Sequence, residues 1–164
     1  MIIYFIRHGI AESRSIEKDD SHRILTSKGI TKTQKVAQKL SYLDIKFDVI
    51  ITSPYVRAKE TAILLQQAKL APEIIEHSAL TPEGNILEWI NWLQNSDYND
   101  RSSIALVGHQ PDFSNWVELL IFGEIKGKLV VKKSGIIAIK IFDLSNPIGN
   151  SELFLLAGPK WITN

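Results

Sequence analysis

The sequence predicts an α/β fold, a three-layer αβα sandwich whose mostly parallel sheet carries an antiparallel C-terminal hairpin at its edge. Three short apolar runs, each followed by turn residues, are typical of buried parallel strands, and segments with a helical period lie between them. After Gly123 the helical pattern gives way to strand-like runs joined by turns, which indicates a hairpin region.

The pattern assigns each element in order. The three apolar runs are expected to form the parallel strands at residues 2–6, 47–51 and 104–107. Helices are expected around residues 30–43, 56–68, 86–93 and 113–121. The first helix buries a side formed by Ile30, Val36, Ala37, Leu40 and Leu43. Its expected cap is Thr26 or Ser27, and Gly123 is expected to end the last helix. The hairpin region is expected to contain strands at residues 129–131, 135–142 and 152–157.

Length and composition favour a single domain over residues 1–164, since 164 residues with 45% hydrophobic side chains suit one compact unit. Nineteen basic and eighteen acidic residues leave a formal charge of +1. Such a balance provides no overall field for nucleic acid or an anionic membrane, and we expect neither as a partner.

The sequence favours a cytoplasmic location. It contains no cysteine, which excludes thiol chemistry and gives no sign of an oxidising compartment. The apolar run at residues 1–6 is far shorter than the ~18 residues that a transmembrane helix needs. It also lacks the basic leader and the cleavage site of a secretory signal.

Polar residues follow each of the three apolar runs. Arg7-His8-Gly9 follows the first, residues 53–57 (Ser-Pro-Tyr-Val-Arg) follow the second, and residues 108–111 (Gly-His-Gln-Pro) follow the third. In an open α/β sheet, ligands bind at the edge where the carboxyl ends of the parallel strands meet. We therefore expect two arginines and two histidines in one crevice at this edge.

This crevice is expected to bind an anion, because several potential cations repel one another unless a ligand of opposite charge joins them. Phosphate is the natural candidate, since guanidinium groups pair with its oxygens bidentately. Arg57 is also expected in the first turn of a helix, where free amides and the helix dipole favour an anion. With no cysteine and no cluster of carboxylates, we expect no metal and no cofactor.

Other conspicuous residues have structural interpretations. Two histidines that do not follow a strand are expected to be partly exposed loop residues: His22 and His77. Three tryptophans in helical patterns are expected to be packing residues: Trp89, Trp92 and Trp116. Four lysines that alternate with apolar residues and glycine are expected on a solvated turn and strand face: Lys126, Lys128, Lys132 and Lys133.

The residues at the strand ends resemble the histidine phosphatase superfamily, whose Arg-His-Gly signature stands at Arg7-His8-Gly9. The family's second block is matched by Ser53-Pro54-x-x-Arg57-Ala58-x-x-Thr61, and its third by Gly108-His109-x-Pro111. Two further blocks are similar to those of the SixA-type phosphohistidine phosphatases: Arg23-Ile24-Leu25-Thr26-x-x-Gly29 and Leu80-Thr81-Pro82-x-Gly84. The matching blocks run from residue 2 to residue 111.

The resemblance implies that His8 is the nucleophile, which takes the phosphoryl group to form a phosphohistidine intermediate that water hydrolyses. Arg7, Arg57 and His109 would hold the equatorial oxygens and stabilise their charge. The resemblance adds two substrate-binding candidates: Gly9, where the backbone would pass close to the pocket, and Arg23. For Arg23, a solvent-exposed loop arginine is the alternative.

The chain departs from the family at the general acid. Many members that cleave alkyl phosphates place a glutamate just after the leucine of the block near Leu80, where this chain has Pro82, with Glu83 one residue later. Glu83 is the candidate acid, and an exposed loop carboxylate is the alternative. An alkoxide, with a conjugate-acid pKa of ~16, needs a proton donor to leave, whereas imidazole, at about 6.5, needs much less help. The chain also has no insertion after the second block that is long enough to form a lid, so a protein surface could reach the site.

The expected function is a metal-independent phosphatase that acts on phosphohistidine in a protein partner, a phosphorelay domain of the histidine phosphotransfer type, and releases inorganic phosphate. One alternative is a phosphomonoesterase for a small phosphorylated substrate, with Glu83 as the acid. Another is a phosphate-dependent binding module without turnover, against which the retained His8 argues. The missing acid and the missing substrate-enclosing insertions argue against phosphoglycerate mutase activity.

Overall fold

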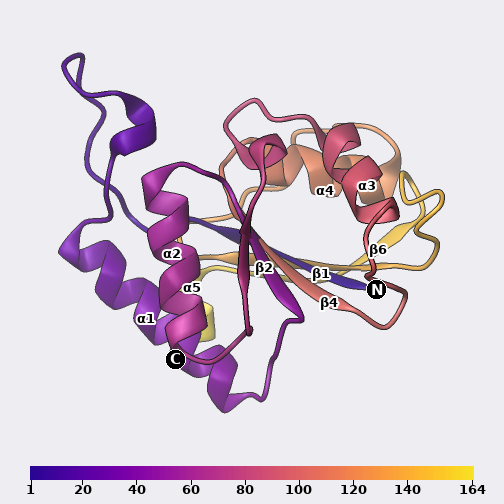
Figure 1. The fold of residues 1–164 in the computed structure, drawn as a ribbon, viewed down its shortest axis with the longest axis horizontal. Coiled ribbons are helices and arrows are strands. Elements are labelled where there is room, and N and C mark those ends of the chain that lie inside the picture. The colour runs from indigo at the N-terminus through magenta and orange to yellow at the C-terminus, as the bar shows by residue number, and fades with distance from the viewer.

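The computed structural model describes residues 1–164 and shows one six-stranded sheet with helices on both faces (Figure 1). The strands are β1 (Ile2–Arg7), β2 (Val49–Thr52), β3 (Ile74–Glu76), β4 (Ser103–Gly108), β5 (Ile136–Ile141) and β6 (Ser151–Ala157). The helices are α1 (Ser27–Tyr42), α2 (Val56–Gln67), α3 (Ile86–Gln94), α4 (Asp112–Phe122) and α5 (Pro159–Ile162). Two short 3₁₀ helices are η1 (Asp20–His22) and η2 (Ser78–Leu80).

The sheet is mostly parallel, as predicted. Its strand order is β3-β2-β4-β1-β5-β6. The first four strands of this order run parallel, β5 is antiparallel to β1, and β6 is antiparallel to β5. Because β6 therefore runs in the same direction as β1, the carboxyl ends of β1, β2, β4 and β6 all lie along one edge of the sheet.

The two faces of the sheet are buried by different helices, which gives the predicted three layers. In β1, Ile3 and Phe5 join a core cluster with α3 and α4, while Tyr4 and Ile6 join a second cluster with α1 and α2. A strand sends successive side chains to opposite faces, so a strand covered on both sides must be apolar throughout. This is why the N-terminal run is apolar at every position.

The helix boundaries follow the predicted signals. The side chain of Thr26 caps α1 by accepting the N–H of Gly29, and Gly123 ends α4 in a left-handed conformation with φ +76°. The expected buried side of α1 was wrong at its two ends, where Ile30 is 36% exposed and Leu43 is 53% exposed. None of the helices combines the length and the apolar character that crossing a membrane requires.

The expected strand at residues 129–131 is absent, and the backbone leading into it is bonded to a side chain instead. The carboxylate of Glu118, fully buried in α4, accepts the backbone N–H groups of the four residues from Lys126 to Leu129. Of the expected strand, Leu129 takes part in these bonds, so its N–H is already satisfied and not free for a ladder. The three-residue strand β3 and the four-residue helix α5 were not predicted, since each is too short to show a period.

Gly29 allows α1 to pass close to the segment after β1. A Cβ atom at Gly29 would lie 2.0 Å from the carbonyl oxygen of Ile10, closer than any real contact. Helix propensity alone predicts that Gly29→Ala stabilises the protein by about 1 kcal/mol. The packing predicts instead that the free energy of unfolding falls by about 1–3 kcal/mol, which urea denaturation measures.

Gly158→Ala is the matched control for this substitution, because the nearest atom to its Cβ would be 3.7 Å away. We expect only a few tenths of a kcal/mol there. A Gly29→Ala protein that is more stable than the wild type would contradict the packing of α1 against residue 10.

Candidate active site

The ends of three neighbouring strands bring the polar residues together, as the sequence predicts. Arg7 at the end of β1 is in register with Gly108 at the end of β4, and the N–H of His8 donates to the carbonyl of Gly108 at 3.0 Å. On the other side of β4, the N–H of Ser53 donates to the carbonyl of Val107 at 2.9 Å. The residues after β1, β2 and β4 are therefore held side by side by backbone hydrogen bonds.

A cleft of about 410 Å³ opens at this edge of the sheet. It has five cationic side chains in its lining and a single carboxylate, that of Glu12. The cations are Arg7, Arg14, Arg23, Arg57 and Lys133. His8 and His109 also line the cleft, which therefore suits an anion with several oxygens.

His8 presents a neutral imidazole to the cleft. Burial lowers the pKa of His8 well below its usual value, and His109 lowers it further. The Nδ1 atom lies 2.7 Å from the carbonyl oxygen of Gly9, which can only accept, so Nδ1 carries the ring proton. The lone pair is left on Nε2, and this is the atom that can attack phosphorus.

The guanidinium group of Arg57 contacts both histidines from the first turn of α2. Its Nε–H donates to His8 Nε2 at 3.3 Å, and its Nη2–H donates to His109 Nδ1 at 3.3 Å. The side chain is only 2% exposed. Asp20 accepts two further bonds from it, through the backbone oxygen at 2.6 Å and through Oδ2 at 2.9 Å.

His109 is also neutral, with its protonation state set by its partners. Burial, followed by Arg57, lowers its pKa to about 3. Because Arg57 donates to Nδ1, the proton of the neutral ring is on Nε2, which donates to Ser53 Oγ at 2.8 Å. The ring of His109 lies 5.2 Å from that of His8, measured between centroids.

Arg7 and Arg23 flank the histidines. Arg7 donates through Nη1 to the carbonyl of Val131 at 2.9 Å, while its buried Nε has no partner within the chain. A bound oxyanion would satisfy this donor. Arg23 is buried at 8% exposure instead of solvent-exposed, and it donates through Nη1 to the carbonyl of Glu12 at 2.6 Å. The structure thus places both arginines on the cleft.

Two sequence candidates lie outside the cleft lining. A Cβ at Gly9 would lie 2.7 Å from Thr33 Oγ1, so this residue faces α1 and serves the site through its carbonyl bond to His8. Glu83 is exposed on a loop with φ +64° and lines a neighbouring cavity with Arg14 and Tyr55. Its neighbour Pro82 lines both cavities.

Three residues that support the site were not predicted from the sequence. Asp20 binds Arg23 and Arg57, and Arg14 pairs with it at 3.0 Å. Partial burial raises the pKa of Asp20, but Arg57, Arg23 and Arg14 outweigh this effect and hold the pKa below its usual value. Ser53 orients His109, and its place directly after a strand could have indicated this role. Asp20 lies in an irregular segment, where no such signal exists.

No group of three or more histidine, cysteine, aspartate or glutamate side chains lies close enough together to hold a metal ion.

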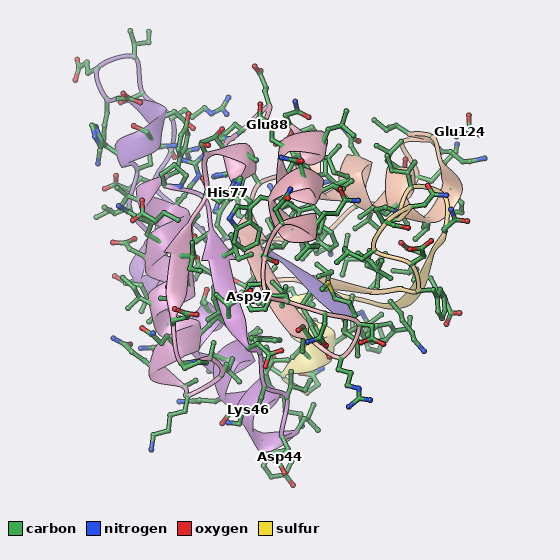
Figure 2. The ribbon with its side chains drawn as sticks, turned by 45° about the vertical axis from the view of Figure 1, so that its right-hand side comes forward. Asp44, Lys46, His77, Glu88, Asp97 and Glu124 are labelled. Atoms are coloured by element: carbon green, nitrogen blue, oxygen red, sulfur yellow. The ribbon has the colours of Figure 1, made fainter.

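The two histidines outside the cleft are His22 and His77. His22 is exposed, and His77 caps η2 by accepting the N–H of Ala79. Figure 2 shows His77 beside α3. The partly exposed His77 agrees with the loop position expected from the sequence, whereas His22 is the last residue of η1.

Comparisons with known proteins assign the chain to a family. The model of the histidine phosphatase superfamily (branch 1) matches residues 3–81. A phosphohistidine phosphatase SixA homolog of Haemophilus influenzae is 32% identical over 144 residues, which cover 83% of this chain and 81% of that protein. The chain belongs to the histidine phosphatase superfamily.

The similarity extends over the whole chain. An uncharacterised protein of Picosynechococcus sp. is 40% identical over 163 residues, 99% of both chains. The solved structure of the protein histidine phosphatase SixA complexed with tungstate has the same fold, with a TM-score of 0.85, 24% identity and 99% of both chains covered. The fold is therefore that of SixA throughout, and the match to the SixA homolog of Haemophilus influenzae makes the chain a SixA-type phosphatase hydrolase of this superfamily.

The two neutral histidines predict a pH dependence of stability. Below about pH 6.5 each binds a proton in the unfolded chain, while in the folded protein His109 stays neutral down to about pH 3. The unfolded state then binds more protons, so the free energy of unfolding falls as the pH drops. The slope is up to about 1.4 kcal/mol per pH unit for each histidine.

Urea denaturation between about pH 7 and about pH 5 measures this slope, and His109→Asn provides the comparison. We expect the free energy of unfolding of the variant to depend less steeply on pH, because one of the two neutral histidines is missing. This expectation concerns the slope and not the absolute free energy of unfolding. An identical slope in the two proteins would show that His109 is not held neutral by the fold.

Proposed function

We propose that this chain is a metal-independent phosphatase that removes the phosphoryl group from phosphohistidine on a protein, a phosphorelay domain of the histidine phosphotransfer type. One observation carries the proposal. The cleft offers a neutral nucleophilic nitrogen among five cationic side chains, but no protonated carboxylic acid for the leaving group. The names of the SixA homolog and of the SixA structure support the same substrate class.

The first step transfers the phosphoryl group to His8. The hydrogen bond from Arg57 to Nε2 of His8 breaks, and the freed lone pair forms a bond to phosphorus on one side while the bond to the substrate histidine breaks on the other. The other ring nitrogen of the substrate histidine carries a proton, so the electron pair of the broken bond leaves with a neutral imidazole. Arg7, Arg23 and Arg57 stabilise the charge on the equatorial oxygens during the transfer.

The second step regenerates the enzyme. Water attacks the phosphorus of phospho-His8, the bond to Nε2 breaks, and its electron pair returns to the ring. The proton of the water passes to the phosphate that leaves, so His8 ends neutral as it began. The bond from Nδ1 to the carbonyl of Gly9 keeps Nε2 directed at phosphorus in both steps.

The carboxylates near the cleft are poorly suited to act as general acids. A hydrogen bond from Lys18 is the main cause of the lowered pKa of Glu12, and three arginines lower that of Asp20. Both are ionised at neutral pH and hold no proton to donate. Imidazole is a much better leaving group than an alkoxide, so this cleft favours a phosphorus–nitrogen bond over a phosphate ester.

We further propose that residues 1–164 form a single domain and that the protein works in the cytoplasm. One sheet extends through the chain from residue 2 to residue 157, and the two core clusters lie on its two faces. The open cleft would give a protein-bound phosphohistidine direct access to His8.

The test compares phosphate release from a histidine-phosphorylated phosphotransfer domain with release from a sugar phosphate. We expect rapid release from the phosphohistidine domain only, and its loss in His8→Ala, because this variant lacks the proposed nucleophilic nitrogen. Preference for the sugar phosphate would contradict the proposal. Tight tungstate binding without hydrolysis of either substrate would favour a binding module.

The same assay examines the alternative role of Glu83. Removing a general acid lowers a rate by about 10²–10⁴-fold. Because Glu83 is exposed and lies outside the cleft lining, we expect Glu83→Gln to hydrolyse both substrates as the wild type does. A loss of about 100-fold on the sugar phosphate would make this residue the acid of a phosphomonoesterase.

A further inference from the structure

Three segments of the chain carry lysines and no acidic residue. Residues 21–43, 125–142 and 153–164 contain no aspartate or glutamate, although the whole chain has eighteen. The first segment includes α1, the last includes α5, and these two helices pack against each other (Figure 1). The packing of α1 against α5 therefore brings two lysine-bearing segments without acidic residues together in a molecule whose net charge is only +1.

Four of these lysines line an open groove of about 560 Å³ between α1 and α5. Lys28, Lys32 and Lys35 are spaced by four and three residues, which places them on one face of α1. Lys160 faces them from α5. No hydrophobic side chain apart from Pro159 takes part in the lining, so the groove offers ammonium groups and hydroxyls.

A second hollow of about 420 Å³ continues the first and shares Lys32 and Lys160 with it. It adds Lys132 and the indole of Trp161, which is 83% exposed. We call the surface formed by six of these residues the lysine groove: Lys28, Lys32, Lys35, Lys132, Lys160 and Trp161. The groove combines cationic groups with a large exposed aromatic side chain.

The segment before β5 links the lysine groove to the catalytic cleft along the chain. Lys132 lies in the groove, and the next residue, Lys133, lines the cleft. Ser134, the next residue, fixes this segment to the end of β1 and to α1. Its N–H donates to the carbonyl of Arg7 at 3.0 Å, and its hydroxyl lies 2.9 Å from that of Thr33 in α1.

The lysines of the groove repel one another without compensation. No aspartate or glutamate forms an ion pair with any of the five. Like charges four residues apart destabilise a helix, and Lys28 in the first turn also opposes the helix dipole. A bound acidic partner would offset this repulsion, because its carboxylates attract the lysine ammonium groups.

We propose that the lysine groove docks an acidic surface of the phosphorylated protein substrate and so directs its phosphohistidine into the cleft. This inference rests on the proposed function, whose partner it describes further. A protein fits better than a nucleic acid, because Trp161, with the exposed Val130 and Leu156 beside it, adds apolar contact and the net charge is small.

The test replaces four groove lysines together: Lys28→Gln, Lys32→Gln, Lys35→Gln and Lys160→Gln. Lys133 is left intact because it lines the cleft. A matched control replaces four lysines outside the groove: Lys46→Gln, Lys69→Gln, Lys126→Gln and Lys140→Gln. Figure 2 shows Lys46 at the end of the molecule opposite η1.

Both variants are assayed on an acidic histidine-phosphorylated protein domain and on free phosphohistidine. We expect the groove variant to lose about tenfold or more of kcat/KM on the protein at low salt, since electrostatic steering contributes about 10–10³-fold to association. Its kcat/KM on free phosphohistidine should be unchanged, and the control should match the wild type on both. High salt should remove the difference. Equal kcat/KM of both variants on the protein would overturn the proposal.

A binding measurement tests the lysine groove independently of phosphatase activity. Fluorescence anisotropy compares a polyglutamate peptide with an RNA oligonucleotide, and co-sedimentation uses phosphatidylglycerol vesicles. The proposal expects the peptide to bind the wild type and the control, and to bind the groove variant more weakly. Binding of RNA or vesicles in its place would overturn the assigned partner. If the wild type hydrolyses neither phosphohistidine substrate, the proposed function fails, and the peptide alone decides whether the groove binds acidic protein.

Discussion

The guanidinium group of Arg57 is the interaction on which the site depends. It contacts the histidine that follows β1, the histidine that follows β4 and the aspartate of η1, so one side chain joins three segments far apart in sequence. The ring of Tyr55 lies 5.0 Å from its central carbon and adds a cation–π contact. Because its donors form a rigid fork, the position of Arg57 determines where each of these partners can lie.

A buried cation of this kind is costly unless its donors are satisfied. Asp20 supplies the opposite charge, while His8 and His109 accept hydrogen bonds as neutral rings. Burial is the main cause of the lowered pKa values of both histidines, and Arg57 lowers them further. His8 therefore stays unprotonated and nucleophilic beside the buried cation.

Much of the fold and the central residues of the site follow from the sequence. Three apolar runs predict parallel strands, and parallel strands must bring their carboxyl ends to one edge, where the structure places His8, Arg57 and His109. Asp20 could not be predicted, because its position in an irregular segment depends on ion pairs with distant arginines. The segment at residues 129–131 has the composition of a strand, but the buried carboxylate of Glu118 binds the backbone N–H groups just before it.

The central claim is that Nε2 of His8 carries the phosphoryl group during turnover. The most direct measurement reacts the protein with a ³²P-labelled phosphohistidine domain, quenches it in alkali, which preserves phosphohistidine, and locates the label by peptide mapping. ³¹P NMR of the phosphoprotein then identifies the nitrogen. The account predicts a phosphoryl group on Nε2 of His8 and none in His8→Ala. Label on His109, or turnover without a covalent intermediate, would contradict it.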